Sequence, residues 1–223
     1  MPRQLSFDLP AITALGREDY FVSPANATAV ALIEGWRNWP GRKLMLCGPA
    51  GAGKTHLTHV WAALSGARIV AARDLAGADI PDLASGNLAI EDADQIGGTE
   101  GEEALFHLHN LILAQGHSLL MSAQRAPSFW PLTLPDLASR MQGTPTCMLR
   151  DPDDGLLAAV MMKLLADRQI MPAPGTIEYL TKRMPRSFQA AHRVVAALDR
   201  AALETGRPVG RALAAQVLDK LGE

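Results

Sequence analysis

The octapeptide Gly48-Pro49-Ala50-Gly51-Ala52-Gly53-Lys54-Thr55 decides the fold. It matches G-x-x-x-x-G-K-[ST], the phosphate-binding loop. Its glycines let the backbone turn through positive φ and approach an anion without a Cβ in the way, so that bare N–H groups can point at phosphates. Lys54 is expected to reach the β- and γ-phosphates, and the Thr55 hydroxyl to ligate Mg²⁺. The alternative is a glycine-rich turn that binds nothing.

The segments on either side of this loop favour the phosphate-binding interpretation. Residues 43–47 form an apolar run typical of a short buried strand, and residues 56–64 have the pattern of a helix. A strand, a loop and a helix in this order bring backbone N–H groups and a helix N-terminus to the anion. His56, the first residue after the motif, is included in the predicted binding segment.

Composition narrows the class of protein. The chain has 223 residues, 48% of them hydrophobic, which is enough for one α/β domain and a small appendage. A formal net charge of −2 gives no electrostatic footprint for duplex DNA, so no sequence-specific DNA binding is expected. Cys47 and Cys147 lie in apolar runs and are expected to be buried free thiols. Without a bilayer-length apolar run or a signal-peptide pattern, we expect a cytoplasmic protein with no membrane partner.

Strands and helices alternate through the first two thirds of the chain. A helix is expected at residues 25–39, ended by Pro40-Gly41. The expected strands are residues 44–47, 68–72, 88–91, 118–122 and 146–150, with a helix at residues 102–114. This alternation predicts an α/β fold in which a parallel five-stranded sheet carries helices on both faces and ligands bind at the carboxyl ends of its strands.

The pattern predicts three parts. Residues 1–11 form a short N-terminal segment, residues 12–150 the α/β base, and residues 151–223 a small all-helical lid. The boundary is marked by Asp151-Pro152-Asp153-Asp154, where acids and a proline make a linker and then a helix N-cap. The lid helices are expected at residues 155–168, 176–183, 187–204 and 211–221.

Acidic and polar residues follow two of the predicted strands. Glu91 and Asp92 end an apolar strand, where acids can hold the hydration shell of Mg²⁺ and orient an attacking water. We assign Glu91 to the metal side and Asp92 to the base; the alternative is a strand that ends in a polar turn. Ser122 or Gln124, at the end of another strand, could touch a phosphate or the water.

The joint pattern over residues 18–221 resembles the DnaA branch of the AAA+ ATPases, most of all its Hda family of DnaA-related regulatory inactivators. The resemblance is carried by the loop with His56, Leu57 and His59, by Tyr20-Phe21-Val22 with Asn26, by Leu134-Pro135-Asp136-Leu137-Ala138-Ser139-Arg140 and by Leu198-Asp199-Arg200-Ala201. It implies an AAA+ fold that binds ATP or ADP with Mg²⁺, with Phe21 and Val22 on the adenine side.

The resemblance also implies partners. The segment Gln4-Leu5-Ser6-Phe7-Asp8-Leu9 is similar to the peptide with which Hda proteins dock on the DNA polymerase III sliding clamp, its beta subunit. Gln4 would supply amide hydrogen bonds, and Leu5, Phe7 and Leu9 would supply apolar plugs for a pocket. A disordered tail is the alternative. Arg140 matches the arginine finger, which acts in trans on ATP bound to DnaA.

Two absences separate the regulator from the origin initiator. We expect no C-terminal helix-turn-helix domain, because the chain ends after the lid. Residues 73–87 are too few and too acidic for the initiator's single-strand grip. The resemblance is therefore to a regulator of initiation.

Several residues depart from the family pattern. Glu91 stands where Asp is usual, and Gln124 occupies the first-sensor place. The second-sensor place falls on Gln189, with Arg186 one turn before it and Arg193 one turn after it, and either arginine or neither could supply the charge. We therefore expect nucleotide holding, of ADP in particular, rather than strong hydrolysis by this chain alone.

Two other functions compete with this interpretation. A helicase-loader-type AAA+ adaptor would need a helicase-binding segment at its N-terminus and a single-strand grip. A P-loop small-molecule kinase would need an acceptor pocket and a lid arginine used in cis. A homo-oligomer is compatible with each of these functions.

Overall fold

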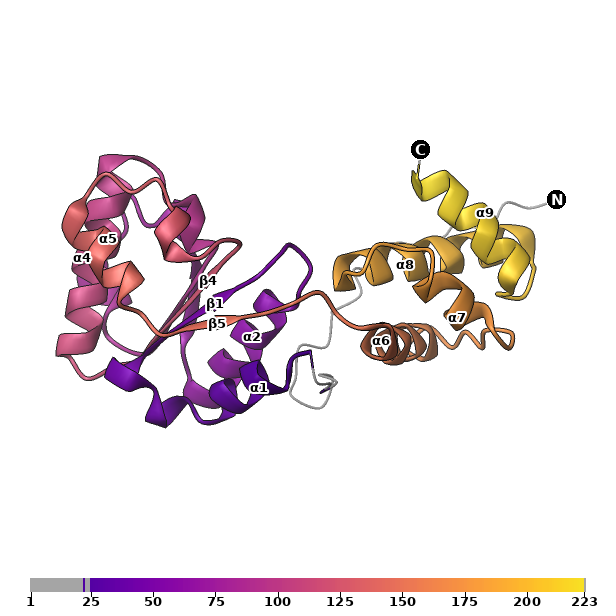
Figure 1. The fold of residues 1–223 in the computed structure, drawn as a ribbon, viewed down its shortest axis with the longest axis horizontal. Helices are drawn as coiled ribbons and strands as arrows, with labels where there is room; N and C mark the ends of the chain where they lie inside the picture. Colours follow the sequence, from indigo (N-terminus) through magenta and orange to yellow (C-terminus); the bar gives the residue numbers. More distant parts are fainter. Residues whose placement is uncertain (1–21, 23–24, 223) are drawn as a thin grey trace.

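The computed structural model describes residue 22 and residues 25–222, so the predicted docking peptide and Phe21 lie outside the described residues. The base is built on five parallel strands, shown in Figure 1: β1 (Lys43–Cys47), β2 (Arg68–Ala71), β3 (Leu88–Glu91), β4 (Leu119–Ala123) and β5 (Thr146–Met148). Their order in the sheet is β2-β3-β4-β1-β5. The predicted parallel five-stranded α/β fold is confirmed.

Alternating side chains of β1, an inner strand between β4 and β5, pack into two separate cores. Leu44 and Leu46 contribute to the core under α1 (Ala27–Glu34) and α2 (Lys54–Ser65). Met45 and Cys47 point to the opposite face, where the core includes residues of α4 (Gly98–Ala114) and α5 (Pro135–Gln142). Because β1 is buried on both faces from Leu44 to Cys47, these four residues are all apolar rather than alternating.

The helix expected at residues 25–39 is shorter than predicted. It ends at Glu34, and a 3₁₀ turn, η2 (Trp36–Asn38), follows Gly35. Trp39 is extended, with ψ 130°, as a residue before proline prefers. Its ring stacks on Trp61 of α2 at 5.3 Å between centroids, so packing against α2 takes the place of the last helical turns.

Short elements connect the strands of the base. The connection from β2 to β3 contains the 3₁₀ turn η4 (Ala72–Asp74) and α3 (Ile80–Leu83). The remaining 3₁₀ turns are η3 (Pro40–Arg42), η5 (Ala93–Gln95) and η6 (Pro127–Phe129).

The C-terminal helices form a body with its own core. They are α6 (Asp154–Ala166), α7 (Thr176–Thr181), α8 (Phe188–Thr205) and α9 (Arg211–Gly222). Figure 1 shows this lid beside one end of the base, reached through the segment that follows β5. Two side chains cap the lid helices: Asp153 Oδ1 accepts from Leu156 N at 2.7 Å, and Ser187 Oγ accepts from Ala190 N at 3.1 Å. Among the described residues, no helix has the length and apolar character required to cross a membrane.

Candidate functional site

The glycine-rich loop has a backbone conformation that residues with a side chain would adopt only with strain. Gly51 and Gly53 lie in the left-handed region, with φ 78° and 92°. A Cβ on Gly48 would lie 2.7 Å from the carbonyl oxygen of Leu149, so the loop starts where two backbones touch. The helix α2 begins directly after Gly53, at Lys54. The loop therefore leaves bare backbone at a helix N-terminus, as an anion site requires.

Lys54 is folded back into this loop. Its side chain is buried, and Nζ donates to the carbonyl oxygens of Gly48 at 2.7 Å and Pro49 at 2.9 Å. Burial lowers the pKa of Lys54, while nearby acids, first Asp92 and then Asp94, oppose that shift. The ammonium is thus held within the loop at a position from which it could exchange two carbonyl partners for a phosphate.

Three acids lie at the end of β3 or just after it, and the charge of each raises the pKa of Lys54. Asp92 adopts a left-handed conformation with φ 52°, and its N–H donates to Ser122 Oγ on β4 at 3.2 Å. One carboxylate oxygen of Glu91 and one of Asp94 are buried without a hydrogen-bond partner among the described residues. Buried polar atoms without a hydrogen-bond partner are rare, so these two oxygens are available to a bound water or cation. The sequence pattern did not identify Asp94 as a site residue. Its charge acts on Lys54 in the structure, where the backbone turns at Asp92.

The strand order brings the predicted polar residues to one edge of the sheet. Since β4 lies between β3 and β1, Gln124, just after β4, lies between the acids and the loop. Gln124 and Thr55 are exposed, whereas Ser122 is buried and bonds the Asp92 backbone. Of the two residues predicted to touch a phosphate or water, Ser122 and Gln124, only Gln124 is therefore accessible to a ligand. His56 is half-buried in the first turn of α2, and the Val22 side chain is exposed.

The residues present fit Mg²⁺ held mainly by water. Among the described residues, no group of three or more His, Cys, Asp or Glu side chains forms a protein cage for a metal. Mg²⁺ keeps several waters and is bound through one or two carboxylates plus substrate phosphates. The exposed Thr55 hydroxyl and the unpartnered oxygen of Glu91 are donors of that kind.

The N-terminus of α8 touches the loop directly. Phe188 N donates to the carbonyl oxygen of Gly51 at 2.9 Å. A Cβ on Gly51 would lie 2.9 Å from Ser187 Cβ and 3.3 Å from Gln189 Cβ. Of the three second-sensor candidates, Gln189 is therefore the one beside the loop. Arg186 instead pairs with Asp154 at 3.0 Å, and Arg193 is exposed.

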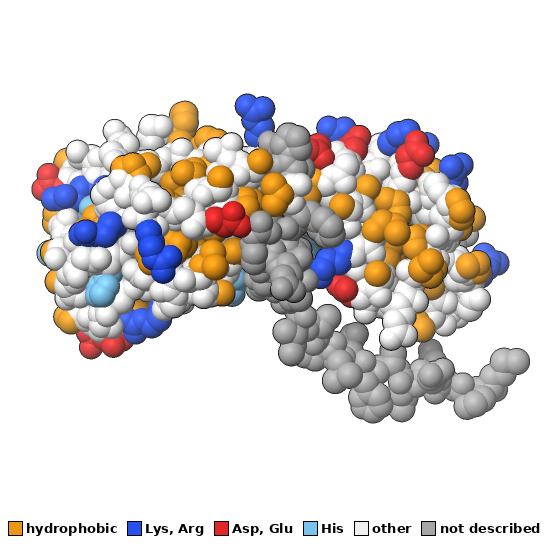
Figure 2. Space-filling view, turned by 90° about the horizontal axis from the view of Figure 1, so that it is seen from below, with side chains coloured by type: hydrophobic (Ala, Val, Ile, Leu, Met, Phe, Trp, Pro, Cys, Tyr) orange, Lys and Arg blue, Asp and Glu red, His pale blue; other side chains and the backbone are white. Residues whose placement is uncertain are grey.

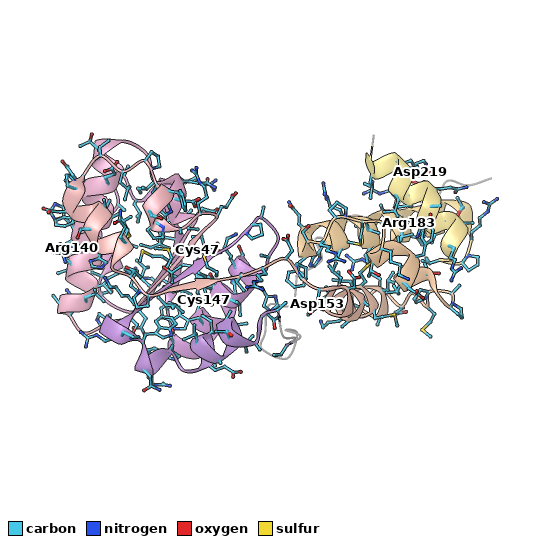
Figure 3. The ribbon with its side chains drawn as sticks, in the orientation of Figure 1. Cys47, Arg140, Cys147, Asp153, Arg183 and Asp219 are labelled. Carbon is cyan, nitrogen blue, oxygen red and sulfur yellow. The ribbon has the colours of Figure 1, made fainter. Side chains whose placement is uncertain are left out.

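Arg140 lies at the opposite edge of the sheet from the loop. It is exposed in the last turn of α5, and its guanidinium carbon is 5.2 Å from the ring centroid of Phe106. Its carbonyl oxygen lies near Lys43, the first residue of β1, whereas the loop follows the last residue of that strand. Five strand residues span about 13 Å. Figure 3 shows Arg140 at the end of the base distant from the lid.

Comparison with known sequences gives distant relatives. No protein-family model matches the chain. An uncharacterised protein of Haemophilus influenzae is 28% identical over 175 residues, covering 72% of this chain and 74% of that protein. The chromosomal replication initiator protein DnaA of Thermomicrobium roseum is 25% identical over an alignment that covers 90% of this chain and 48% of that protein. The chain thus spans about half the length of that initiator.

Comparison with solved structures identifies the class of fold. Domain III of the Thermotoga maritima replication initiation protein DnaA superposes with a TM-score of 0.82 at 19% identity, covering 95% of this chain and 98% of that domain. AMPPCP-bound DnaA from Aquifex aeolicus gives a TM-score of 0.70 at 17% identity, covering 84% of this chain and 65% of that one. The chain has an AAA+ fold with a phosphate-binding-loop sequence. Within that class its fold is DnaA-like.

Proposed function

We propose that this chain is an Hda-like regulator of replication initiation. It binds an adenine nucleotide and the sliding clamp, and it stimulates hydrolysis of ATP bound to DnaA through Arg140 acting in trans. The observation that carries the proposal is the placement of Arg140, which is exposed and lies across the sheet from the chain's own loop.

The nucleotide site supports the first part of the proposal. Backbone N–H groups of residues 48–55 would hold phosphate oxygens, Lys54 would neutralise them, and Thr55 with Glu91 would hold Mg²⁺. Mg²⁺, when bound, would supply positive charge next to the phosphates. The DnaA structure of similar fold that carries AMPPCP makes an adenine nucleotide the favoured ligand. Phe21 and Val22 would lie on the adenine side.

The lid supports nucleotide holding rather than rapid turnover. Gln189, a neutral side chain, lies beside the loop, and Arg186 is engaged by Asp154. A neutral amide gives less stabilisation to developing phosphoryl charge than a guanidinium would. The chain's own nucleotide then serves to order the base and lid, with Asp92 and Gln124 available to a water.

Arg140 supports the action in trans. Within the described part of the chain, no ion pair joins Arg140 to Asp136, so the guanidinium is not neutralised by the acid one turn before it. An arginine supplied by a partner stabilises transition-state charge and can raise phosphoryl transfer by ~10³-fold or more. The product would be DnaA–ADP.

The sliding clamp would bring this protein close to DnaA. Gln4, Leu5, Phe7 and Leu9 would tether the chain to DNA-loaded clamp, which raises its effective concentration near DNA-bound DnaA. No contact with a specific DNA sequence is needed for this arrangement.

A single-turnover assay tests the proposal. Hydrolysis of DnaA-bound ATP is followed with and without this protein and DNA-loaded clamp, and stimulation is expected only when both are present. Arg140→Ala should remove the stimulation, and Arg140→Lys should fail as well because lysine lacks the planar fork. Arg200→Ala, at an exposed position of α8, is the matched control. Full stimulation by the Arg140→Ala variant would contradict the action of Arg140 in trans, and it would leave clamp tethering as the protein's proposed role.

A further inference from the structure

The helix that carries Arg140 is bound by charged side chains at both of its ends. At its start, Glu102 of α4, only 4% exposed, accepts from Thr133 N at 3.0 Å, Leu134 N at 2.7 Å and Thr133 Oγ1 at 3.1 Å. At its end, Lys43 Nζ donates to the carbonyl oxygen of Arg140 at 3.4 Å. Thr144 Oγ1 donates to the same oxygen at 2.9 Å.

These charges have the signs that a helix dipole favours. The Glu102 carboxylate is bonded to the N-cap residue Leu134, and the Lys43 ammonium lies beside a carbonyl of the last turn; a negative charge near a helix N-terminus and a positive charge near its C-terminus are each stabilising. Helix α5 has only eight residues, too short to be stable by its own hydrogen bonds. Its stability therefore rests on tertiary contacts: Leu137 and Met141 bury one face in the core, and the bonds at its two ends hold its termini.

The lysine is itself held in place. Lys43 Nζ lies 3.1 Å from Nε2 of the buried His109. An ammonium has only donors, so Nε2 accepts, and Nδ1 carries the proton that it shares with Asn110 Oδ1 at 3.3 Å. The chain of contacts runs from Asn110 through His109 and Lys43 to the backbone of Arg140.

We infer that Lys43 and Glu102 are positioning residues that hold α5 by its two ends and so fix where Arg140 is presented to a partner. This inference rests on the proposed function for its purpose, but the holding of α5 is a property of this chain alone. The guanidinium is exposed and lies over the face of Phe106, so its position depends on how its helix is held. A misplacement of about 1 Å can cost roughly 10²-fold in rate.

Hydrogen exchange of residues 135–143 tests the holding directly. Lys43→Met keeps the aliphatic stem and removes the charge, and Glu102→Gln keeps the shape and removes the negative charge. We expect exchange in α5 to become at least tenfold faster in both, with the exchange of β4 and the lid helices unchanged. The controls are Lys220→Met on α9 and Glu103→Gln, which is exposed on α4 next to Glu102. Unchanged exchange in α5 for Lys43→Met would overturn the inference.

Single-turnover hydrolysis of DnaA-bound ATP then separates positioning from mere stability. Lys43→Met should lower the maximal rate roughly 10- to 100-fold while the half-saturating concentration of this protein and its affinity for a fluorescent ADP analogue stay the same. An unchanged maximal rate, with faster exchange, would overturn the positioning role. Failure of the unaltered protein to stimulate hydrolysis would refute the proposed function, and the exchange result would still decide whether α5 is held.

Discussion

At the scale of single residues, Lys54 decides whether the loop is a binding site. Its ammonium now bonds two carbonyls of the loop itself and must exchange them for phosphate oxygens. We expect Lys54→Ala to weaken binding of a fluorescent ADP analogue by roughly 10- to 100-fold, because a charge-assisted hydrogen bond contributes about 1.5–3 kcal/mol. Lys220→Ala, exposed on α9, is the control. Equal affinities of the two variants for the ADP analogue would contradict the assignment of this loop as a phosphate-binding site.

Gly48 offers a second residue-scale test, because its Cβ would meet a backbone atom that cannot rotate away. We expect Gly48→Ala to lower the free energy of unfolding by about 1–3 kcal/mol, as forced overpacking does, since the new methyl would lie 2.7 Å from the Leu149 carbonyl oxygen. Gly86→Ala is matched, because there a Cβ meets no described atom within 4 Å. Urea unfolding compares the two; similar midpoints would show that β1 and the segment after β5 can separate at no cost.

His109 gives a pH dependence whose sign can be worked out. Burial first, and then the positive charge of Lys43, lower its pKa to about 4, against an ordinary value of 6.5, while the bond to Asn110 opposes them. Arg140 also lowers this pKa. Between pH 6.5 and 4 the unfolded chain binds more protons, so stability is fully present above pH 6.5 and is lost as pH falls toward 4.

Urea unfolding across this pH range measures the effect. The unaltered protein should lose up to about 3 kcal/mol between pH 6.5 and 4 from this one group. His109→Gln should show a smaller loss over the same range, because it retains a hydrogen-bonding side chain that does not titrate. Parallel pH curves for the two proteins would contradict the assignment. His192, whose pKa burial also lowers, is common to both proteins and cancels in the comparison.

At the scale of elements, helix α8 joins the lid to the loop by a single backbone bond, from Phe188 N to Gly51 O. Phe188 is the first residue of α8, where proline is tolerated, and Ser187 before it is already extended at φ −146° and ψ 149°. Phe188→Pro therefore deletes the donor without breaking the helix. We expect dissociation of a fluorescent ADP analogue to be roughly 3- to 10-fold faster than in Phe188→Ala, which keeps the N–H. Equal rates would show that the bond does not hold the lid to the loop.

The elements also show what the sequence could predict. The five strands were found because apolar runs beside glycine and proline mark buried strands of a parallel sheet. The order of strands could not be found, because it depends on contacts between distant segments. Helix α5 was not among the expected helices, since its segment is matched only by resemblance to the arginine-finger segment. The helix near residue 25 ends before the expected residue 39 because Trp39 packs on Trp61 instead of continuing it.

Part of the candidate site has a local sequence pattern, and part of it does not. The loop and the acids after β3 have local patterns, so they could be identified without a structure. Asp94 could not, because its approach to Lys54 depends on the positive φ of Asp92. Glu102 did leave a signal: it is an acid on the apolar face of α4, in register with the buried Leu105 and Ile112.

At the scale of the whole molecule, the two proposed contacts lie in different parts of the chain. The docking peptide belongs to residues 1–11, outside the described residues, and Arg140 lies on the base. In Figure 2, the end of the base distant from the lid shows lysine and arginine side chains together with acidic ones. A tether in one segment and an exposed arginine in another would allow the proposed clamp and DnaA partners to be bound together.

The tether can be removed separately. Gln4→Ala with Leu5→Ala should abolish retention of the protein by DNA-loaded clamp in a pull-down, because the peptide loses an amide and an apolar plug. Affinity for a fluorescent ADP analogue should stay the same, and so should the unfolding midpoint. Ser6→Ala, between the proposed contact residues, is the control. Clamp retention that survives the double change would show that the peptide is not the docking segment.

Strand β1 has one further consequence. The loop follows its last residue, and its first residue contacts the backbone of Arg140. A strand covered on both faces can neither stretch nor slip, because a one-residue shift would turn Leu44 and Leu46 into the wrong core. If Arg140 contacts a DnaA subunit as proposed, the length of this strand would help to fix the separation of the two bound nucleotides. Insertions or deletions in loops that do not connect to β1 would leave that separation unchanged.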